Sequence, residues 1–385
     1  MAQIFGSPGR YVQQRDLIGD IGEYVDDIGT NALFVASPTA KKITEPRIAS
    51  SLDERDIALA TEEFTRESTA AEIDRLGKRA QEVDAEFIIG AGGGKTLDTV
   101  KAVGEEQNIP SVIVPTIAST DAPCSALSVV YTEEGEFEEY RYLSAHPRAV
   151  LVDTTVIAEA PTDLFIAGIG DAMATWFEAE AVRNADGDNV LGGKDTLAGP
   201  RLAQLCYETI REHSRSAVDA VDANAVTESV EHVVEANTLL SGVGFESGGI
   251  AAAHSVHNGL VQVEATHGAL HGEKVNIGTL TQLVLEGRDD EFIREIAEFS
   301  LDIGLPVTLA DIGLDDPTDE QLTTIAEAAC AEGETIHEHT FDVSPEMVRD
   351  ALLTADQLGR RVSQTHSDTA PVESGPLRAS SPAAE

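Results

Sequence analysis

The chain of 385 residues is poor in basic side chains, with 26 Lys and Arg against 68 Asp and Glu and a formal net charge of −42. Only seven of the basic residues are lysines. Such a charge repels phosphate backbones and anionic lipid surfaces, which excludes general binding to nucleic acid or to membranes. The acidic residues are spread along the whole chain. Because molar salt shortens the screening length to roughly 3 Å, this spread predicts a protein of a salt-rich, halophilic cytoplasm; an ordinary acidic cytosolic protein is the alternative.

Cysteines and long apolar runs are also scarce. The three cysteines, Cys124, Cys206 and Cys330, lie far apart with no CxxC spacing, which argues against a disulfide framework and fits a reducing cytoplasm. No basic segment followed by an apolar stretch opens the chain, so we expect no signal peptide and a cytoplasmic location. No run of about 20 apolar residues predicts a membrane span. Apolar residues still make up 42% of the chain, which is enough for the cores of two or three domains.

The first 160 residues alternate short apolar runs with segments of helical spacing. We predict strands at 32–36, 87–89 and 111–114, helices at 69–83 and 96–104, and a strand or a turn at 57–63. Continuous apolar strands that alternate with helices indicate a parallel sheet covered by helices. Residues 1–160 are therefore predicted to form an α/β domain.

From residue 161 the pattern becomes helical. Ala-, Glu- and Leu-rich segments with a 3.6-residue period predict helices at Leu164–Arg183, Gly199–His213, Val226–Gly242, Asp290–Ile303, Asp319–Ala331 and Pro345–Val362. Residues 161–365 are thus expected to form an all-α domain. Residues 366–385 are rich in Ser, Pro and Ala, and their composition predicts a disordered tail.

A glycine run, Gly90–Lys95, joins a predicted strand to a predicted helix. Glycines there let backbone N–H groups approach a phosphate, and the helix N-terminus adds partial positive charge. Lys95, one of few lysines, can contribute a further positive charge. The run matches neither the Walker pattern nor the spaced dinucleotide fingerprint, so a tight strand-to-helix turn remains an alternative.

Small hydroxyl side chains follow the next strand, in Pro115–Ser125. Thr116, Ser119 and Ser125 offer hydrogen bonds, and Asp121 offers a carboxylate. The carboxyl ends of parallel strands are where open α/β sheets bind ligands. A turn with capping residues is the alternative.

The third pattern is a histidine cluster with a distant aspartate. His254 and His257 are three residues apart and can project from one helix face, His271 follows closely, and Asp171 lies in a Gly-Ile-Gly-Asp segment. Two histidines with a carboxylate form a three-ligand site for a divalent metal that leaves room for substrate. Alternatively, the histidines line a helix interface and Asp171 caps a helix.

Together these segments resemble the iron-containing alcohol dehydrogenase superfamily, and within it most closely the glycerol dehydrogenases. The resemblance runs from about Ile4 to about Val362. Its landmarks, in chain order, are GAGGGKTLDTVKAV (90–103), PTIASTDAPCSALSVVYTEEGEFEEY (115–140), GIGDAMATWFEA (168–179), LGGKDTLA (191–198), AAAHSVHNGL (251–260) and HGEKV (271–275). Six landmarks in order are far more specific than any one alone.

The resemblance implies the dehydroquinate synthase-like fold and an NAD-dependent oxidation of glycerol and related vicinal diols to dihydroxyacetone. It implies that Asp171, His254 and His271 hold Zn²⁺, or Fe²⁺, and contact substrate. It places His257 beside the metal and Asp121 against glycerol, as the catalytic pair. It also implies a homo-oligomer, commonly an octamer. The positions expected to bind the nicotinamide cofactor are Ser37, Gly92, Gly93, Gly94, Lys95, Thr116, Ser119, Ser125, Leu127 and Tyr131.

One of these positions departs from the pattern of the family. Members that prefer NAD often carry an acid after the first strand, where it holds the ribose hydroxyls, but this chain has Ser37, followed by Lys41 and Lys42. Loss of the acid removes repulsion against a 2′-phosphate. We expect NAD, with NADP left open.

Two relatives with the same architecture are alternatives. The sn-glycerol-1-phosphate dehydrogenases of archaeal lipid synthesis need a phosphate site, and the Thr120–Pro123 and HGEK segments do not resemble theirs. The 3-dehydroquinate synthases, which are lyases, need more Lys and Arg around the substrate than the metal segments supply.

Overall fold

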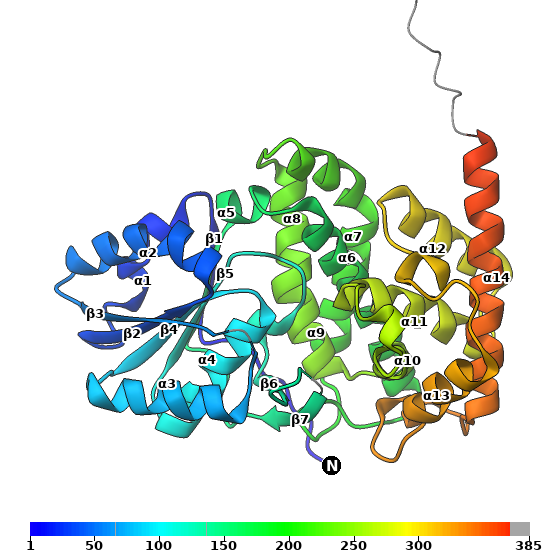
Figure 1. The fold of residues 1–385 in the computed structure, drawn as a ribbon, viewed down its shortest axis with the longest axis horizontal. Coiled ribbons are helices and arrows are strands. Elements are labelled where there is room, and N and C mark those ends of the chain that lie inside the picture. Colours follow the sequence, from blue (N-terminus) through cyan, green and yellow to red (C-terminus); the bar gives the residue numbers. More distant parts are fainter. Residues whose placement is uncertain (66, 136, 370–385) are drawn as a thin grey trace, which may run out of the picture.

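The computed structural model describes residues 1–65, 67–135 and 137–369, and it divides into a sheet-containing half and a helical half (Figure 1). Six parallel strands form the main sheet in the order β1-β8-β5-β4-β2-β3. Their bounds are β1 Tyr11–Gln14, β2 Asn31–Ala36, β3 Ala58–Glu63, β4 Phe87–Gly92, β5 Ser111–Pro115 and β8 Ala149–Asp153. The segment 57–63, which the sequence left as strand or turn, is therefore a strand.

Alternate residues of the strands enter two cores, one on each face of the sheet. Leu33 and Val35 join the core under α3 (Ala70–Glu82) and α4 (Gly94–Gln107). Phe34 and Ala36 join the core under α1 (Gly22–Val25) and α2 (Pro38–Asp53). The period of two explains why these strands read as continuous apolar runs, since both faces are covered.

The chain changes direction between β2 and β4. From β2 it moves outward to β3, and then returns to place β4 on the other side of β2. At such a switch point the loops after the two strands diverge and leave a crevice at their carboxyl ends, where ligands bind. Here those loops carry Ser37 and the glycine run.

A two-stranded antiparallel hairpin, β6 (Leu127–Tyr131) and β7 (Phe137–Tyr142), follows β5 and the one-turn helix η2 (Ala122–Cys124). A short α5 (Thr154–Ala158) then follows β8. The predicted division at residue 160 falls in the link between α5 and α6, and the domain boundaries stay a prediction.

The second half is built of helices that pack side by side (Figure 1). They are α6 Thr162–Asn184, α7 Gly199–Asp222, α8 Glu228–Glu235, the π-helical η3 Ala236–Leu240, α9 Ser241–Gly248, α10 Ala252–Val261, α11 His271–Leu285, α12 Asp290–Asp302, α13 Asp319–Ala329 and α14 Pro345–Thr369. A parallel sheet followed by a helical half confirms the predicted fold class. Helix α14 includes residues 366–369, and residues 370–385, the rest of the predicted tail, lie outside the described residues.

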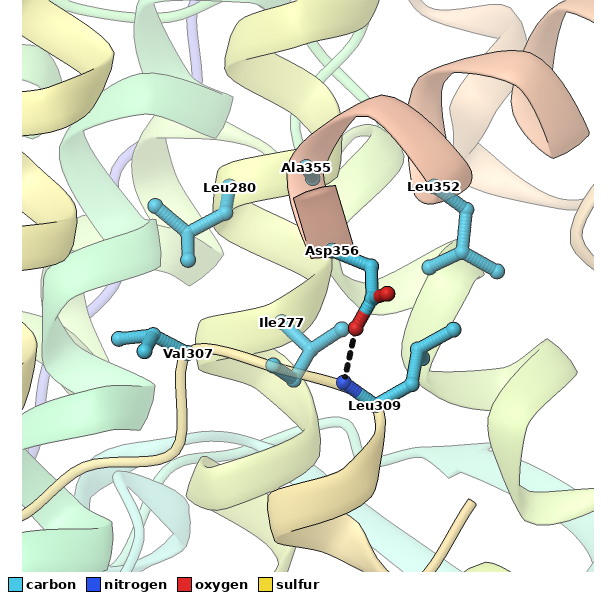
Figure 2. Close-up of a pocket in the computed structure, with 7 residues that line it drawn as sticks. All are labelled: Ile277, Leu280, Val307, Leu309, Leu352, Ala355 and Asp356. Carbon is cyan, nitrogen blue, oxygen red and sulfur yellow. Dashed lines mark hydrogen bonds between the residues drawn. The ribbon is translucent and has the colours of Figure 1, made fainter. Parts of the chain in front are cut away.

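One small pocket lies in the helical half, and none of the predicted site residues lines it (Figure 2). Its lining is mostly apolar, with side chains from α11, α14 and the segment 307–309, and it offers no space for a water molecule. Asp356 accepts a hydrogen bond of 2.8 Å from the Leu309 backbone amide and pairs with Arg360 at 2.7 Å. We interpret this pocket as a packing feature of the core. Among the described helices, none has the length and apolar character needed to cross a membrane.

Candidate active site

Asp171, His254 and His271 lie together at the side of the helical half that faces the β5–β6 connection. The Asp171 Oδ1 atom lies 3.1 Å from His271 Nε2 and 3.4 Å from His254 Nε2. One potential ligand atom from each residue lies within 4.8 Å of the others. The three residues thus come together from α6, α10 and the first position of α11. Asp171 and His271 are 100 residues apart in the sequence.

Two glycines allow α6 and α11 to approach closely enough for this convergence. A Cβ atom at Gly170 would collide with the Gly272 carbonyl oxygen, and one at Gly272 would collide with the Ala167 carbonyl oxygen. The residues beside these glycines are Asp171 and His271. The backbones therefore meet at the point where the two side chains must share one site.

Glu178 orients His254 from two turns further along α6. Its Oε2 lies 2.6 Å from His254 Nδ1, and its Oε1 accepts backbone hydrogen bonds of 3.0 Å from Ala251 and His254. Glu178 is fully buried. This contact fixes the ring orientation, so that Nε2 points toward Asp171. A carboxylate behind a histidine is the usual support of a metal-ligating imidazole.

The electrostatics of the cluster keep Asp171 ionised. Burial alone would raise its pKa, but His271 and hydrogen bonds from His254 and His271 hold that pKa well below its usual range. An ionised, buried carboxylate beside two imidazoles is the donor set that Zn²⁺ and Fe²⁺ accept. With Glu178 behind His254, the residues present fit a divalent metal ion.

His257 lies next to this group and not within it. Its ring centroid is 4.2 Å from that of His271, and its Nδ1 contacts Asn258 Oδ1 at 3.1 Å. Burial, together with the nearby His271 and His254, lowers the pKa of His257 well below its usual value. A neutral imidazole in this position can accept a proton.

Asp121 joins the cluster from the other half of the molecule. Its backbone amide donates to Asp171 Oδ2 at 3.1 Å, and its Oδ2 accepts from the Ser241 hydroxyl at 2.8 Å. Burial and the negative charge of Asp171 raise the pKa of Asp121 well above its usual value. Asp121 is thus fixed directly beside Asp171, one of the three candidate ligands.

The π-helical η3 places the residues that hold the Asp121 loop. Asn237 is buried and donates to the Ala118 carbonyl at 3.0 Å and to the Phe165 carbonyl at 3.3 Å. Ser241, which holds Asp121, begins the helix that follows. A π turn shifts the helical register, and such turns are frequent at functional sites.

The glycine run lies on the opposite side of the same loop. Gly93 precedes α4 and Gly94 begins it, and no side chain caps the helix. A Cβ atom at Gly93 would lie 2.8 Å from Ile117 Cδ1, and one at Gly94 would lie 3.4 Å from Thr120 Oγ1. The backbone amides at this helix start have no side-chain cap and no Cβ at Gly93 or Gly94 beside them, which fits a phosphate group.

Several predicted cofactor residues surround this helix start. Ala36 pairs with Ala91 in the sheet, so Ser37 follows β2 close to Gly92, and the Thr116 amide donates to the Gly92 carbonyl at 3.1 Å. Lys95 Nζ lies 2.6 Å from both carboxylate oxygens of Glu67 and 4.9 Å from the Tyr131 ring centroid. Ser119 is half-buried in the loop.

Ser125 and Leu127 lie on the inner side of the loop. Ser125 is 1% exposed, and its hydroxyl lies 3.3 Å from Lys101 Nζ and 3.3 Å from the Ala122 carbonyl oxygen. The Leu127 carbonyl also accepts from Lys101. The structure thus brings the Ser125 hydroxyl to a buried lysine, whereas Ser37, Gly92, Thr116, Lys95 and Tyr131 lie around the glycine run. The cofactor contacts of both groups stay predictions.

Four residues of the site were not found from the sequence: Glu67, Glu178, Asn237 and Ser241. Glu178 carried a usable signal, because it lies seven residues after Asp171 in a predicted helix and therefore on the same face. The other three lie on segments whose approach to the loop depends on tertiary packing. No local pattern indicates them.

Comparisons with known proteins identify the family of the chain. The family described as "Iron-containing alcohol dehydrogenase" matches residues 8–154. A glycolaldehyde reductase of Halobacterium salinarum is 56% identical over 94% of this chain and 99% of its own length. A glycerol dehydrogenase of Escherichia coli is 47% identical over 94% of this chain and 99% of its own.

The fold of a solved relative is also close. The crystal structure of glycerol dehydrogenase from Schizosaccharomyces pombe superposes with a TM-score of 0.91 at 37% identity, over 96% of this chain and 94% of that one. The match therefore includes both halves of the molecule. The chain belongs to the iron-containing alcohol dehydrogenase family.

Proposed function

We propose that the protein is a metal-dependent oxidoreductase that oxidises glycerol and related vicinal diols to dihydroxyacetone and its analogues, with NAD as the hydride acceptor. One observation carries the proposal: the loop 115–125 contacts both the uncapped glycine run and the Asp171–His254–His271 group. A dinucleotide held at the first and a diol held at the second would meet across this loop. Relatives named as glycerol dehydrogenases support the choice of substrate.

In this proposal Asp171, His254 and His271 hold Zn²⁺ or Fe²⁺. A metal ion held by these three residues would supply a Lewis acid for the substrate hydroxyl, and a nicotinamide held at the glycine run would supply the hydride acceptor. Glu178 keeps His254 oriented, and the Gly170–Gly272 contact sets the spacing of Asp171 and His271. The amides of Gly93 and Gly94 would hold the pyrophosphate of the cofactor, and Lys95 and Tyr131 lie beside them.

The remaining roles belong to Asp121 and His257. Asp121 orients the substrate hydroxyls from a position fixed by Ser241 and by Asp171. Such positioning lowers the barrier without contact to the reacting bond. His257 accepts the hydroxyl proton and passes it to water, while its Nδ1 is held by Asn258.

Reduction of glycolaldehyde to ethylene glycol is a second candidate. The specific observation in its favour is the 56% identity to a glycolaldehyde reductase, which exceeds the 47% identity to the Escherichia coli glycerol dehydrogenase. The two reactions run in opposite directions between a vicinal diol and its carbonyl product. The same residues therefore serve both, with His257 donating the proton in the reduction.

The test is a dehydrogenase assay of the purified protein in molar KCl. Glycerol with NAD, glycolaldehyde with NADH and glycerol 1-phosphate with NAD are compared before and after chelation, followed by addition of Zn²⁺ or Fe²⁺. We expect turnover of a small diol or its carbonyl that is lost with the metal and restored by one of the ions. Preferred turnover of glycerol 1-phosphate, or full activity without metal, contradicts the proposal.

The cofactor preference is tested in the same assay with NADP. We propose NAD, although Ser37 lacks the carboxylate that excludes a 2′-phosphate. The Ser37→Asp variant should widen the preference for NAD by lowering the catalytic efficiency with NADP alone. An equal loss with both cofactors contradicts a contact between residue 37 and the ribose.

We further propose a cytoplasmic homo-oligomer, with an octamer as the expected size. The support is the resemblance to the family and, for the location, the absence of disulfide spacing in the sequence. Sedimentation in molar KCl measures the oligomer directly. A monomer at all concentrations would contradict this part of the proposal.

A further inference from the structure

Lys101 is a buried lysine in the middle of α4, and only 2% of its surface is exposed. Its Nζ lies 2.8 Å from the Ala122 carbonyl oxygen, 3.4 Å from the Ser125 carbonyl oxygen and 3.3 Å from the Ser125 hydroxyl. It also donates to the Leu127 carbonyl. All four of these oxygens belong to one segment, 122–127. Burying an ammonium group costs free energy, and the contacts with these four oxygens offset that cost.

Asp98, one turn before Lys101, completes the contact. Its Oδ1 lies 3.0 Å from Lys101 Nζ, and its Oδ2 accepts from the Val129 amide at 3.0 Å. The Asp98 carbonyl accepts from the Ser128 hydroxyl at 2.8 Å. One face of α4 therefore holds the backbone from residue 122 to residue 129. We call Lys101 and Asp98 the α4 clamp.

The same helix begins at the glycine run. Gly94 opens α4, and the space beside it is bounded by Thr120 and Ala122 of the loop. Asp121 lies between these two residues, directly before the clamped segment. A single rigid helix thus carries the proposed cofactor contacts at its start and the attachment of the Asp121 loop two turns later.

We propose that Lys101 is a positioning residue: through the segment 122–127 it sets the separation between the cofactor-binding glycine run and Asp121. This inference rests on the proposed function. Lys101 touches neither the candidate metal ligands nor the glycine run directly, and it acts only through the loop. Removing it should misplace Asp121 and the β6 residues relative to the cofactor, since small misplacements have large kinetic effects.

The test compares Lys101→Met with the neutral double variant Asp98→Asn/Lys101→Met. The single variant leaves Asp98 buried without its partner and should lose stability, whereas the double variant removes both charges and should regain it. Val103→Ala is the matched control, because it trims a buried apolar side chain of the same helix that cannot form hydrogen bonds. Melting temperature, metal content, kcat, KM and NADH affinity are measured for each protein.

We expect both Lys101 variants to lose kcat/KM by about 10- to 100-fold at saturating metal, even where the double variant melts like the parent. Val103→Ala should melt earlier and keep its kinetic constants within about twofold of the parent. Amide hydrogen exchange should accelerate in residues 121–129 of the Lys101 variants. Parent-like kinetics in a stable double variant would overturn the inference and leave Lys101 a merely structural residue.

Two further results distinguish a failure of this inference from a failure of the proposed function. If the parent turns over neither glycerol nor glycolaldehyde, the proposed function fails, and the inference is then judged on NADH affinity: a tenfold loss in the stable double variant supports it, and no loss overturns it. If neither Lys101 variant folds, Lys101→Gln replaces them, because it keeps two of the donors without the charge. This variant should also lose kcat/KM, by a smaller factor than the Met variants. Unchanged kinetics would overturn the inference.

Discussion

The two halves of the molecule build their parts of the site in different ways. The sheet half uses contiguous backbone, since Gly92 ends β4, Gly93 follows it and Gly94 begins α4. The helical half uses side chains that are far apart in sequence, with Asp171, His254 and His271 on three helices. Damage to the first should weaken one ligand in a graded way, whereas damage to the second should remove the metal and the reaction together.

The largest expected effect is at the helical side of this comparison. His271→Ala removes one of three candidate ligands, and we expect loss of bound metal and a fall in activity of at least about 10³-fold, because the Lewis acid contributes several kcal/mol. Metal analysis and a steady-state assay measure both. A metal-free His271→Ala protein with full activity would refute the ligand assignment.

Glu178→Gln should have an intermediate effect. It keeps the shape of the side chain but weakens the charge-assisted contact to His254 Nδ1, and such supporting carboxylates contribute about 10- to 100-fold to metal affinity or activity. Competition with a chelator gives the metal affinity. As a control, Glu180→Gln changes a carboxylate on the same helix that pairs with Arg288 at the surface side. Equal metal affinities for the two variants would argue against the role of Glu178.

Gly93→Ala should have a smaller and more selective effect at the sheet side. The added Cβ atom would lie 2.8 Å from Ile117 Cδ1, so the end of that side chain must move, and the new methyl group would hinder the approach of a phosphate to the helix start. Loss of one hydrogen bond to a charged phosphate, about 1.5 kcal/mol, raises the KM for NAD roughly tenfold. Metal content should stay at the parent level. A drop in metal content would show that the two halves are not separable in this way.

The smallest effect per residue should come from removing salt, which should lower the stability of both halves of the molecule alike. With 68 acidic residues against 26 basic ones, self-repulsion grows as KCl is removed. A loss of about 1 kcal/mol lowers the melting temperature of a domain of 150–250 residues by roughly 2–4 °C. Thermal unfolding from molar to low KCl measures this shift. Indifference to salt would favour an ordinary acidic enzyme.

The sequence predicted the sheet half best where strands are buried on both faces. Residues 87–89 and 111–114 read as strands and are strands, and 69–83 contains α3. Helix α2 was missed because Pro46 and several charged residues interrupt its apolar pattern. Strand β1 was missed as a short and largely polar edge strand, and β8 was also missed although it is apolar and buried.

In the helical half six helical segments were predicted, including the largely buried α6, whereas α11 was not. Each of the six predicted segments contains a helix in the structure. Helix α11 is buried around most of its circumference from Gly272 to Leu283, so it has no polar stripe that would reveal its period. The π turn at 236–240 lies inside the predicted helix 226–242, and its changed hydrogen-bond register leaves no trace in hydropathy.

The site was predictable to the extent that it depends on residue type. Asp171, His254 and His271 were identified together, and the structure brings them together. The supports of Asp121 were not, because Ser241 and Asn237 reach the loop only through packing between the two halves. The inner position of Ser125 was equally hidden, since its partner Lys101 lies on another element.

The backbone contact between Gly170 and Gly272 has a consequence for how this molecule can change. Because α6 and α11 meet there without intervening side chains, the spacing of Asp171 and His271 is set at that point by contact between the two backbones. Substitutions on the outward faces of these helices can then change the surface charge without changing the spacing of Asp171 and His271. A chain can carry 68 acidic residues, as this one does, without any of the surface carboxylates entering its candidate metal site.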